Sequence, residues 1–150
     1  MQKHFLAAPL LAAVLTLGSA SALADIAVSD AWVRATVPAQ KATGAFMQLK
    51  SDADARLLSA TSPVAGVVEI HEMVMDGKVM KMNAVPSLDL PAGKAVELTP
   101  GGYHVMLMDL KQQLKAGEQA KIMLTFEDAK QQRFTQQIEV PIKAMAPAMM

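Results

Sequence analysis

The stretch GYHVMLMDL at Gly102–Leu110 decides the fold class, because its residue types alternate with a period of two. His104, Met106 and Met108 stand at every second position, with a valine and a leucine between them. Successive side chains of a β-strand point to opposite faces of the sheet. The stretch therefore predicts a strand that buries its aliphatic residues and turns a histidine and two methionines to the other face.

Similar short runs recur along the chain between turn-forming clusters, and no long stretch has the 3.6-residue spacing of a helix. One or two helical turns over DLKQQLKAGEQA remain an alternative. The expected strands cover residues 26–33, 44–50, 56–60, 66–75, 78–85, 95–98, 103–110, 119–126 and 134–140. This pattern predicts a single all-β domain, an antiparallel β-sandwich of the immunoglobulin-like or cupredoxin-like kind.

The first 24 residues have the organisation of a secretory signal peptide. Lys3 supplies the charge, residues 6–17 form a short apolar core, and Ala22-Leu23-Ala24 has the small-x-small form of a cleavage site. The apolar run is shorter than the roughly 20 residues of a membrane-spanning helix. We expect cleavage after Ala24 and a periplasmic protein without stable membrane insertion; a retained anchor is the alternative.

Cleavage would leave one domain over residues 25–140 and a tail. Removing 24 of the 150 residues leaves 126, which suits a single domain. Pro141 is expected to end the last strand, so residues 141–150 are expected to form a flexible, methionine-containing tail.

The composition excludes several classes of function. The chain has no cysteine, which excludes thiolate nucleophiles, cysteine-based zinc sites and blue-copper centres. The mature net charge is close to −1, and no basic run with interleaved aromatic residues suggests nucleic acid as a partner. Because no nucleophile elbow, phosphate loop or catalytic dyad is found either, we do not expect an enzyme.

Both histidines downstream of the signal begin a His-x-Met triplet. These are His71-Glu72-Met73 and His104-Val105-Met106. In a strand, the histidine and the methionine of each triplet share one face and lie within reach of one ion. The alternative for each triplet is a packed histidine beside a methionine that fills a gap.

A hairpin signal relates a further methionine to the first triplet. The dipeptide DG at 76–77 predicts a two-residue hairpin loop between two strands. Counting outward from this loop places Met73 opposite Met80 and His71 opposite Met82. Directly opposite residues have Cβ atoms about 4.5–5.5 Å apart, so we expect His71 and Met82 to meet on one face.

The pairing of imidazole with thioether points to a particular ion. Thioethers are soft, uncharged ligands, poorly suited to calcium or magnesium, whereas soft sulfur together with imidazole selects Cu(I). Two histidines and two methionines carry no charge, which suits a monovalent ion. Haem is a competing ligand for a His and Met pair, although the chain has no C-x-x-C-H attachment motif.

These residues and their spacing resemble the PCu(A)C family of periplasmic copper chaperones. Ten residues separate His71 from Met82, and twenty-one separate Met82 from the His104-x-Met106 pair. The surrounding segments AWVRATVP, TGAFMQL, VEIHEMVMDGKVMKM, PGGYHVMLMDLKQQLKAGE and LTFED are also similar to that family. The resemblance covers nearly all of the mature chain.

The resemblance implies a cupredoxin-like sandwich that binds one Cu(I) through His71, Met82, His104 and Met106. It also implies delivery of the ion to the binuclear copper site of cytochrome c oxidase subunit II, alongside a Sco-type thiol protein. The tail has no histidine, unlike the longer tails of many relatives, and this departure argues against a second copper site there. The tail is expected to be either inert or a weak arm that gathers Cu(I). Copper buffering, or an extracytoplasmic protein-binding module without metal, is the alternative function.

Other residues are assigned packing roles. Met73, Met80 and Met108 are expected beside the ligands, and Met75 shares their face as part of an apolar rim or simply as packing. Met47 and Met123 are expected to be core fillers and Trp32 a core aromatic, and Glu69 is a carboxylate without a hydrolytic partner.

Overall fold

A computed structural model describes residues 23–144, which form ten strands. The strands are β1 (Ile26–Arg34), β2 (Ala42–Ser51), β3 (Ala55–Thr61), β4 (Ala65–Asp76), β5 (Val79–Ala84), β6 (Leu88–Leu90), β7 (Ala95–Leu98), β8 (His104–Leu110), β9 (Gln119–Asp128) and β10 (Arg133–Lys143). The short strand β6 is the one that the sequence pattern did not predict. The first 22 residues of the expected signal peptide, and positions 145–150 of the expected tail, lie outside the described residues.

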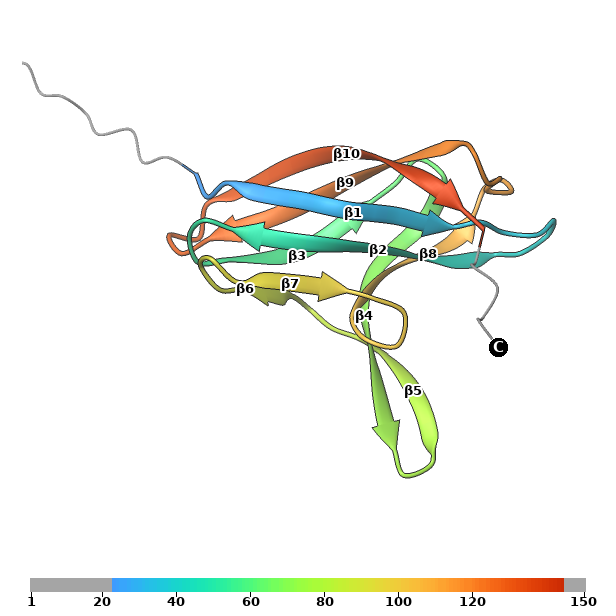
Figure 1. The fold of residues 1–150 in the computed structure, drawn as a ribbon, viewed down its shortest axis with the longest axis horizontal. Coiled ribbons are helices and arrows are strands. Elements are labelled where there is room, and N and C mark those ends of the chain that lie inside the picture. Colours follow the sequence, from blue (N-terminus) through green and yellow to red (C-terminus); the bar gives the residue numbers. More distant parts are fainter. Residues whose placement is uncertain (1–22, 145–150) are drawn as a thin grey trace, which may run out of the picture.

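The strands form the two layers of a β-sandwich. One layer has the order β5-β4-β8-β2-β1, with β7 also paired to β2, and the other has the order β10-β9-β3-β6. Their neighbours pair antiparallel, except that β1 and β10 pair in parallel and join the layers into one continuous path. The prediction of a single all-β, cupredoxin-like sandwich is confirmed (Figure 1). Within the range 23–144, no helix is long and apolar enough to span a membrane.

The core between the layers is built from the aliphatic residues that alternate along the strands. Leu49 on β2 and Val105 on β8 are fully buried from one layer, and Ile122 and Phe126 on β9 are fully buried from the other. Each central strand therefore buries every second side chain in the core and directs the alternate side chains to the outer face of its layer.

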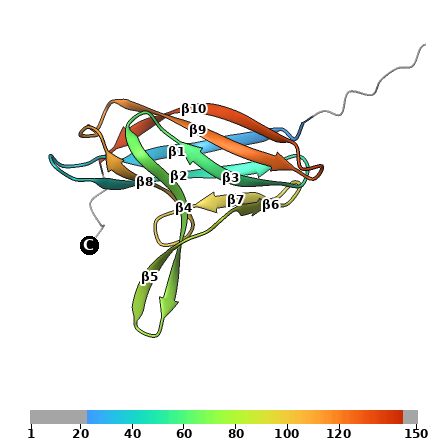
Figure 2. The same ribbon diagram turned by 180° about the vertical axis from the view of Figure 1, so that it is seen from behind.

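One hairpin extends beyond this sandwich. The outer part of β4 and all of β5 project from the body of the molecule, which is visible from both sides (Figures 1 and 2). All six residues of β5 are exposed. The hairpin is therefore held mainly by its own ladder and by the pairing of β4 with β8.

The expected end of the last strand at Val140 is wrong, because β10 continues through Pro141 to Lys143. A proline cannot donate a ladder hydrogen bond, but the next amide restores the ladder. The amide of Ile142 donates to the carbonyl of Glu118 at 2.8 Å, and Ile142 pairs in parallel with Val33. Its side chain is only 3% exposed, so burial in the core holds the chain in the sheet beyond the proline.

We expect Ile142→Ala to lower the free energy of unfolding by about 2–4 kcal/mol, because the substitution leaves a cavity in the core. Urea denaturation of the two proteins measures this difference. Lys143→Ala, at an exposed neighbouring position, is the control and should change stability by less than about 0.5 kcal/mol. An equally small effect of Ile142→Ala would mean that the strand is frayed after Pro141.

Candidate metal centre

The pairing of β4 with β8 brings the two histidines together. His71 lies directly opposite His104 in this antiparallel register, and their ring centroids are 5.8 Å apart. The neighbouring pair, Ile70 and Val105, points the other way and is buried in the core. The predicted alternation of β8 is thus confirmed, with its histidine and methionines on the outer face of the sheet.

The predicted register of the β4–β5 hairpin is wrong by two residues. The loop consists of Gly77 and Lys78, because the glycine takes a left-handed φ of 64° at the first loop position, where a type II′ turn requires it. Met82 consequently lies opposite Met73, and His71 lies opposite Ala84. Since side chains repeat every two residues, this displacement keeps Met82 on the same face as both His71 and Met73.

Three methionines and one histidine line a hollow of about 220 Å³ on this outer face. Two of the predicted ligands, Met106 and His104, come from β8, and a third, Met82, comes from the hairpin. Met73 also lines the hollow, although the sequence placed it beside the ligands. The other lining residues are Arg34, Gln40, Ala42, Thr43, Gly44, Phe46, Pro100 and Gly101.

The loop before β8 fixes the orientation of His104. Thr99–Gly102 forms a β-turn in which the amide of Gly102 donates to the carbonyl of Thr99, with proline and then a positive-φ glycine at the central positions. The turn directs the carbonyl of Gly102 at the ring, and Nδ1 of His104 donates to it at 3.1 Å. In the neutral imidazole, Nε2 then keeps its lone pair and can bind a metal ion.

The same carbonyl joins the turn to the hairpin. It also accepts the backbone N–H of Met73 at 3.3 Å. A single oxygen atom therefore fixes the ring of His104 and the backbone of one methionine that lines the hollow.

His71 stands beside the hollow and does not line it. Its Nε2 lies 2.7 Å from Oε2 of Glu69, a carboxylate on the same face of β4. A carboxylate acceptor places the proton on Nε2, which leaves a lone pair on Nδ1. That Nδ1 is buried and has no hydrogen-bond partner among residues 23–144, an arrangement that costs free energy unless its lone pair binds a group such as a metal ion. Glu69, which the sequence gave no role, thus orients this histidine.

Two aromatic residues, Trp32 on β1 and Phe46 on β2, pack beside His104. Phe46 is only 4% exposed, and its ring centroid lies 6.2 Å from that of His104 and 4.8 Å from that of Trp32. Trp32 therefore packs on the outer face, and the expectation of a core aromatic is wrong. The ring of Phe46 lies over Gly44, where an added Cβ would come within 2.8 Å of it. Because Gly44 also lies opposite Met106, the missing side chain leaves room for the hollow.

A positive charge borders the hollow. The guanidinium carbon of Arg34 lies 5.3 Å from the centroid of the Phe46 ring, and the buried Nε of Arg34 has no hydrogen-bond partner in the described part of the chain. Burial lowers the pKa of His104 below its ordinary value of 6.5, and the neighbouring charges of His71 and Arg34 lower it further, against the hydrogen bond to Gly102. His104 therefore stays neutral, with its lone pair free, to a lower pH than an exposed histidine.

The other methionines among residues 23–144 lie in four different places. Met75 and Met80 lie at the exposed end of the hairpin, and neither lines the hollow. Met108 lies on the same outer face of β8, also away from the hollow. Met47 is buried as expected, but Met123 is 39% exposed on β9, so its assignment as a core filler is wrong.

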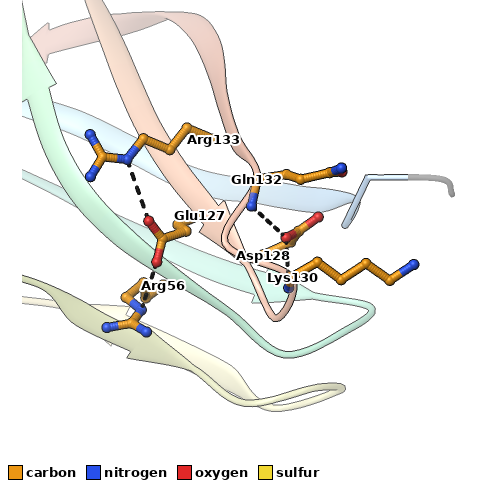
Figure 3. A network of polar contacts seen from close by, with 6 residues as sticks. All are labelled: Arg56, Glu127, Asp128, Lys130, Gln132 and Arg133. Atoms are coloured by element: carbon orange, nitrogen blue, oxygen red, sulfur yellow. Dashed lines mark hydrogen bonds and ion pairs between the residues drawn. The ribbon is translucent and has the colours of Figure 1, made fainter.

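A larger hollow of about 570 Å³ lies on the other layer and is a poorer candidate. Its lining contains acidic residues but neither histidine nor methionine. Glu127 there pairs with Arg56 at 3.6 Å and with Arg133 at 3.4 Å, and Asp128 accepts two backbone amides of the β9–β10 turn (Figure 3). These two carboxylates stabilise the strands and the turn. Across residues 23–144, no group of three or more His, Cys, Asp or Glu side chains is placed to hold a metal ion.

Comparisons with known proteins agree with this architecture. The family model described as "LpqE-like: Putative lipoprotein LpqE-like" matches residues 26–141. A protein of Leifsonia xyli subsp. xyli named "Putative lipoprotein Lxx21020" is 33% identical over 124 residues, which cover 82% of this chain and 72% of that protein.

Solved structures show the same fold. The apo form of DR1885 from Deinococcus radiodurans has a TM-score of 0.60 at 33% identity, over 97% of this chain and 95% of that one. Its Cu(I) form has a TM-score of 0.56 at 31% identity, over 79% of this chain and 76% of that one. The apo PCuAC domain of PmoF1 has a TM-score of 0.63 at 23% identity, over 80% of this chain and 94% of that domain. The resemblance to the PCu(A)C proteins is therefore confirmed.

We expect the pKa of His104 in the metal-free protein to lie below 6.5 and to rise in Arg34→Gln, because the substitution removes a nearby positive charge. Titration of the imidazole Cε1–H resonance by NMR measures both values. Because the pKa is lower in the folded protein, the unfolded chain takes up this proton first as the pH falls through 6.5. His104 should therefore lower the free energy of unfolding below pH 6.5 and leave it unchanged at higher pH. Lys121→Gln, on β9, is the control and should leave the titration of His104 unchanged. A pKa at or above 6.5 in the unsubstituted protein would contradict the burial of this ring.

Proposed function

This chain belongs to the LpqE-like family, and we propose that it is a periplasmic metallochaperone that carries one Cu(I) ion. The proposed ligands are His71, Met82, His104 and Met106. The observation that carries the proposal is the convergence of thioether sulfur and a histidine with a free Nε2 on one hollow. A Cu(I) form of DR1885, which is 31% identical over 79% of this chain, supports the choice of ion.

The donor set favours Cu(I) over divalent ions. Thioethers and neutral imidazoles are soft to borderline donors and bring no negative charge to the site. The guanidinium of Arg34 borders the same hollow, and its repulsion of a divalent ion is twice that of a monovalent ion at equal distance. His71 would complete the site through Nδ1, a buried atom for which the described residues offer no hydrogen-bond partner. Met73 lies opposite Met82 and is the alternative source of the second sulfur.

The cargo would leave by ligand exchange. The hollow lies on the outer face of a sheet, bordered by a projecting hairpin, so an acceptor can approach the ion without unfolding the sandwich. Thiolates bind Cu(I) more strongly than thioethers do, and transfer to a cysteine-containing acceptor therefore runs downhill. The proposed acceptor is the binuclear copper site of cytochrome c oxidase subunit II, with a Sco-type thiol protein as a further partner. Copper buffering without a specific acceptor is the second candidate function.

We propose that the signal peptide is removed after Ala24. Cleavage there would convert the backbone nitrogen of Asp25 into an α-ammonium group. That nitrogen already lies 2.7 Å from Oδ1 of Asp52, so the new charge would meet a carboxylate. The mature protein would begin with an ion pair at the start of β1.

We expect the mature protein to bind one equivalent of Cu(I), which native mass spectrometry under an anaerobic reductant can count. The substitutions His104→Ala, Met106→Leu and Met82→Leu should each weaken binding by more than about tenfold, or about 1.4 kcal/mol. Affinity should also fall as the pH is lowered, because protons compete for both imidazoles. Met123→Leu, an exposed methionine on the other layer, is the matched control. A Cu(I) affinity that none of the three substitutions changes would contradict the proposed site. If Met73→Leu weakens binding and Met82→Leu does not, Met73 is the second sulfur ligand.

Delivery and buffering differ in one measurable step. When the Cu(I)-loaded protein is mixed with the metal-free copper-binding domain of an oxidase subunit II, delivery predicts that copper moves to the acceptor, which separation and metal analysis of the two proteins detect. A subunit II domain with its cysteines replaced by serine is the control and should receive none. Retention of the copper by this chain in both mixtures would favour buffering.

A further inference from the structure

The projecting part of the β4–β5 hairpin carries four methionines on one face. Met75 lies directly opposite Met80, and Met73 lies directly opposite Met82 in the next pair on the same face. Among the paired residues from 73 to 82, every side chain on this face is a methionine. The thioethers therefore form a ladder of two pairs along the hairpin.

The opposite face of the same hairpin has an ordinary composition. It carries Val74 and Val79 together with an ion pair between Lys81 and Asp76. Valine suits a strand better than methionine does, and valine is used here where only an apolar residue is needed. The restriction of methionine to one face indicates that sulfur, and not only apolar surface, is required there.

The two pairs differ in their surroundings. Met73 and Met82 line the hollow of the proposed Cu(I) site, whereas Met75 and Met80 lie beyond it and are 62% and 47% exposed. Directly opposite residues have Cβ atoms about 4.5–5.5 Å apart, and the long, unbranched methionine side chain lets both sulfurs of a pair reach one ion. Along the strand, the two pairs are separated by about 7 Å.

We propose that Met75 and Met80 form a second, weaker Cu(I) site made only of thioethers, from which the ion can step to or from Met73 and Met82. The identity of the ion rests on the proposed function; the paired geometry does not. Because thioethers have no proton to lose, this site should bind copper with the same affinity at pH 5 and at pH 8. The hairpin would then be the path by which copper enters or leaves the histidine-containing site.

The test uses the full mature chain with its methionine methyl groups labelled with ¹³C, titrated with Cu(I) under an anaerobic reductant. We expect the first equivalent to shift the methyl signals of Met82 and Met106, and the second equivalent to shift those of Met75 and Met80. The double variant Met75→Leu/Met80→Leu should lose the second equivalent and keep the first, because leucine retains the apolar bulk without the sulfur. Met123→Leu is the matched control and should keep both.

The remaining outcomes separate this site from the main one. In His104→Ala/Met106→Leu, binding at Met75 and Met80 should persist, so a failure of the main site alone leaves this inference standing. A wild-type protein that takes up one equivalent without movement of the Met75 and Met80 signals would overturn the inference. The inference would also be overturned if the double variant Met75→Leu/Met80→Leu kept the copper stoichiometry but transferred copper to an acceptor more slowly. That result would mean that the two methionines form a protein-docking surface.

Discussion

The candidate site depends on the antiparallel register between β4 and β8. This register sets His71 opposite His104 and turns both rings away from the core, because the flanking Ile70 and Val105 occupy the buried face. A displacement of β4 by one residue would exchange its two faces, bury the imidazole of His71 between the layers and expose the aliphatic side chains of β4. The hydrophobic core therefore sets the geometry of the outer face as well as the stability of the sandwich.

Around that pair of strands, one backbone carbonyl and one carboxylate orient the two histidine rings. The carbonyl of Gly102 and the carboxylate of Glu69 each take one ring nitrogen, and each leaves the other nitrogen of its histidine without a proton. Phe46 shields His104 from water, which favours the neutral ring over the protonated one. Arg34 adds a positive charge at the border, which disfavours protons and divalent ions alike.

The position of the hollow, between a rigid sandwich and a projecting hairpin, suits a carrier better than a permanent metal centre. His104 and Met106 belong to a central strand that is anchored in the core on its other face. Met82 belongs to β5, which is exposed throughout and, among residues 23–144, pairs with β4 alone. In the proposed carrier, an incoming donor would therefore displace Met82 before the side chains of β8, as stepwise ligand exchange requires.

The sequence by itself determined the all-β class, the alternation of β8 and the choice of imidazole with thioether, because these follow from a period of two and from side-chain chemistry. It placed the hairpin register two residues from its true position, since the glycine of the Asp-Gly pair can serve either loop position and only the folded ladder selects one. It also could not assign Glu69, Phe46 and Arg34 to the site, because they reach it from separate positions along β4, β2 and β1. Only the tertiary structure decided which nitrogen of each histidine is free, because that depends on contacts that local spacing does not encode.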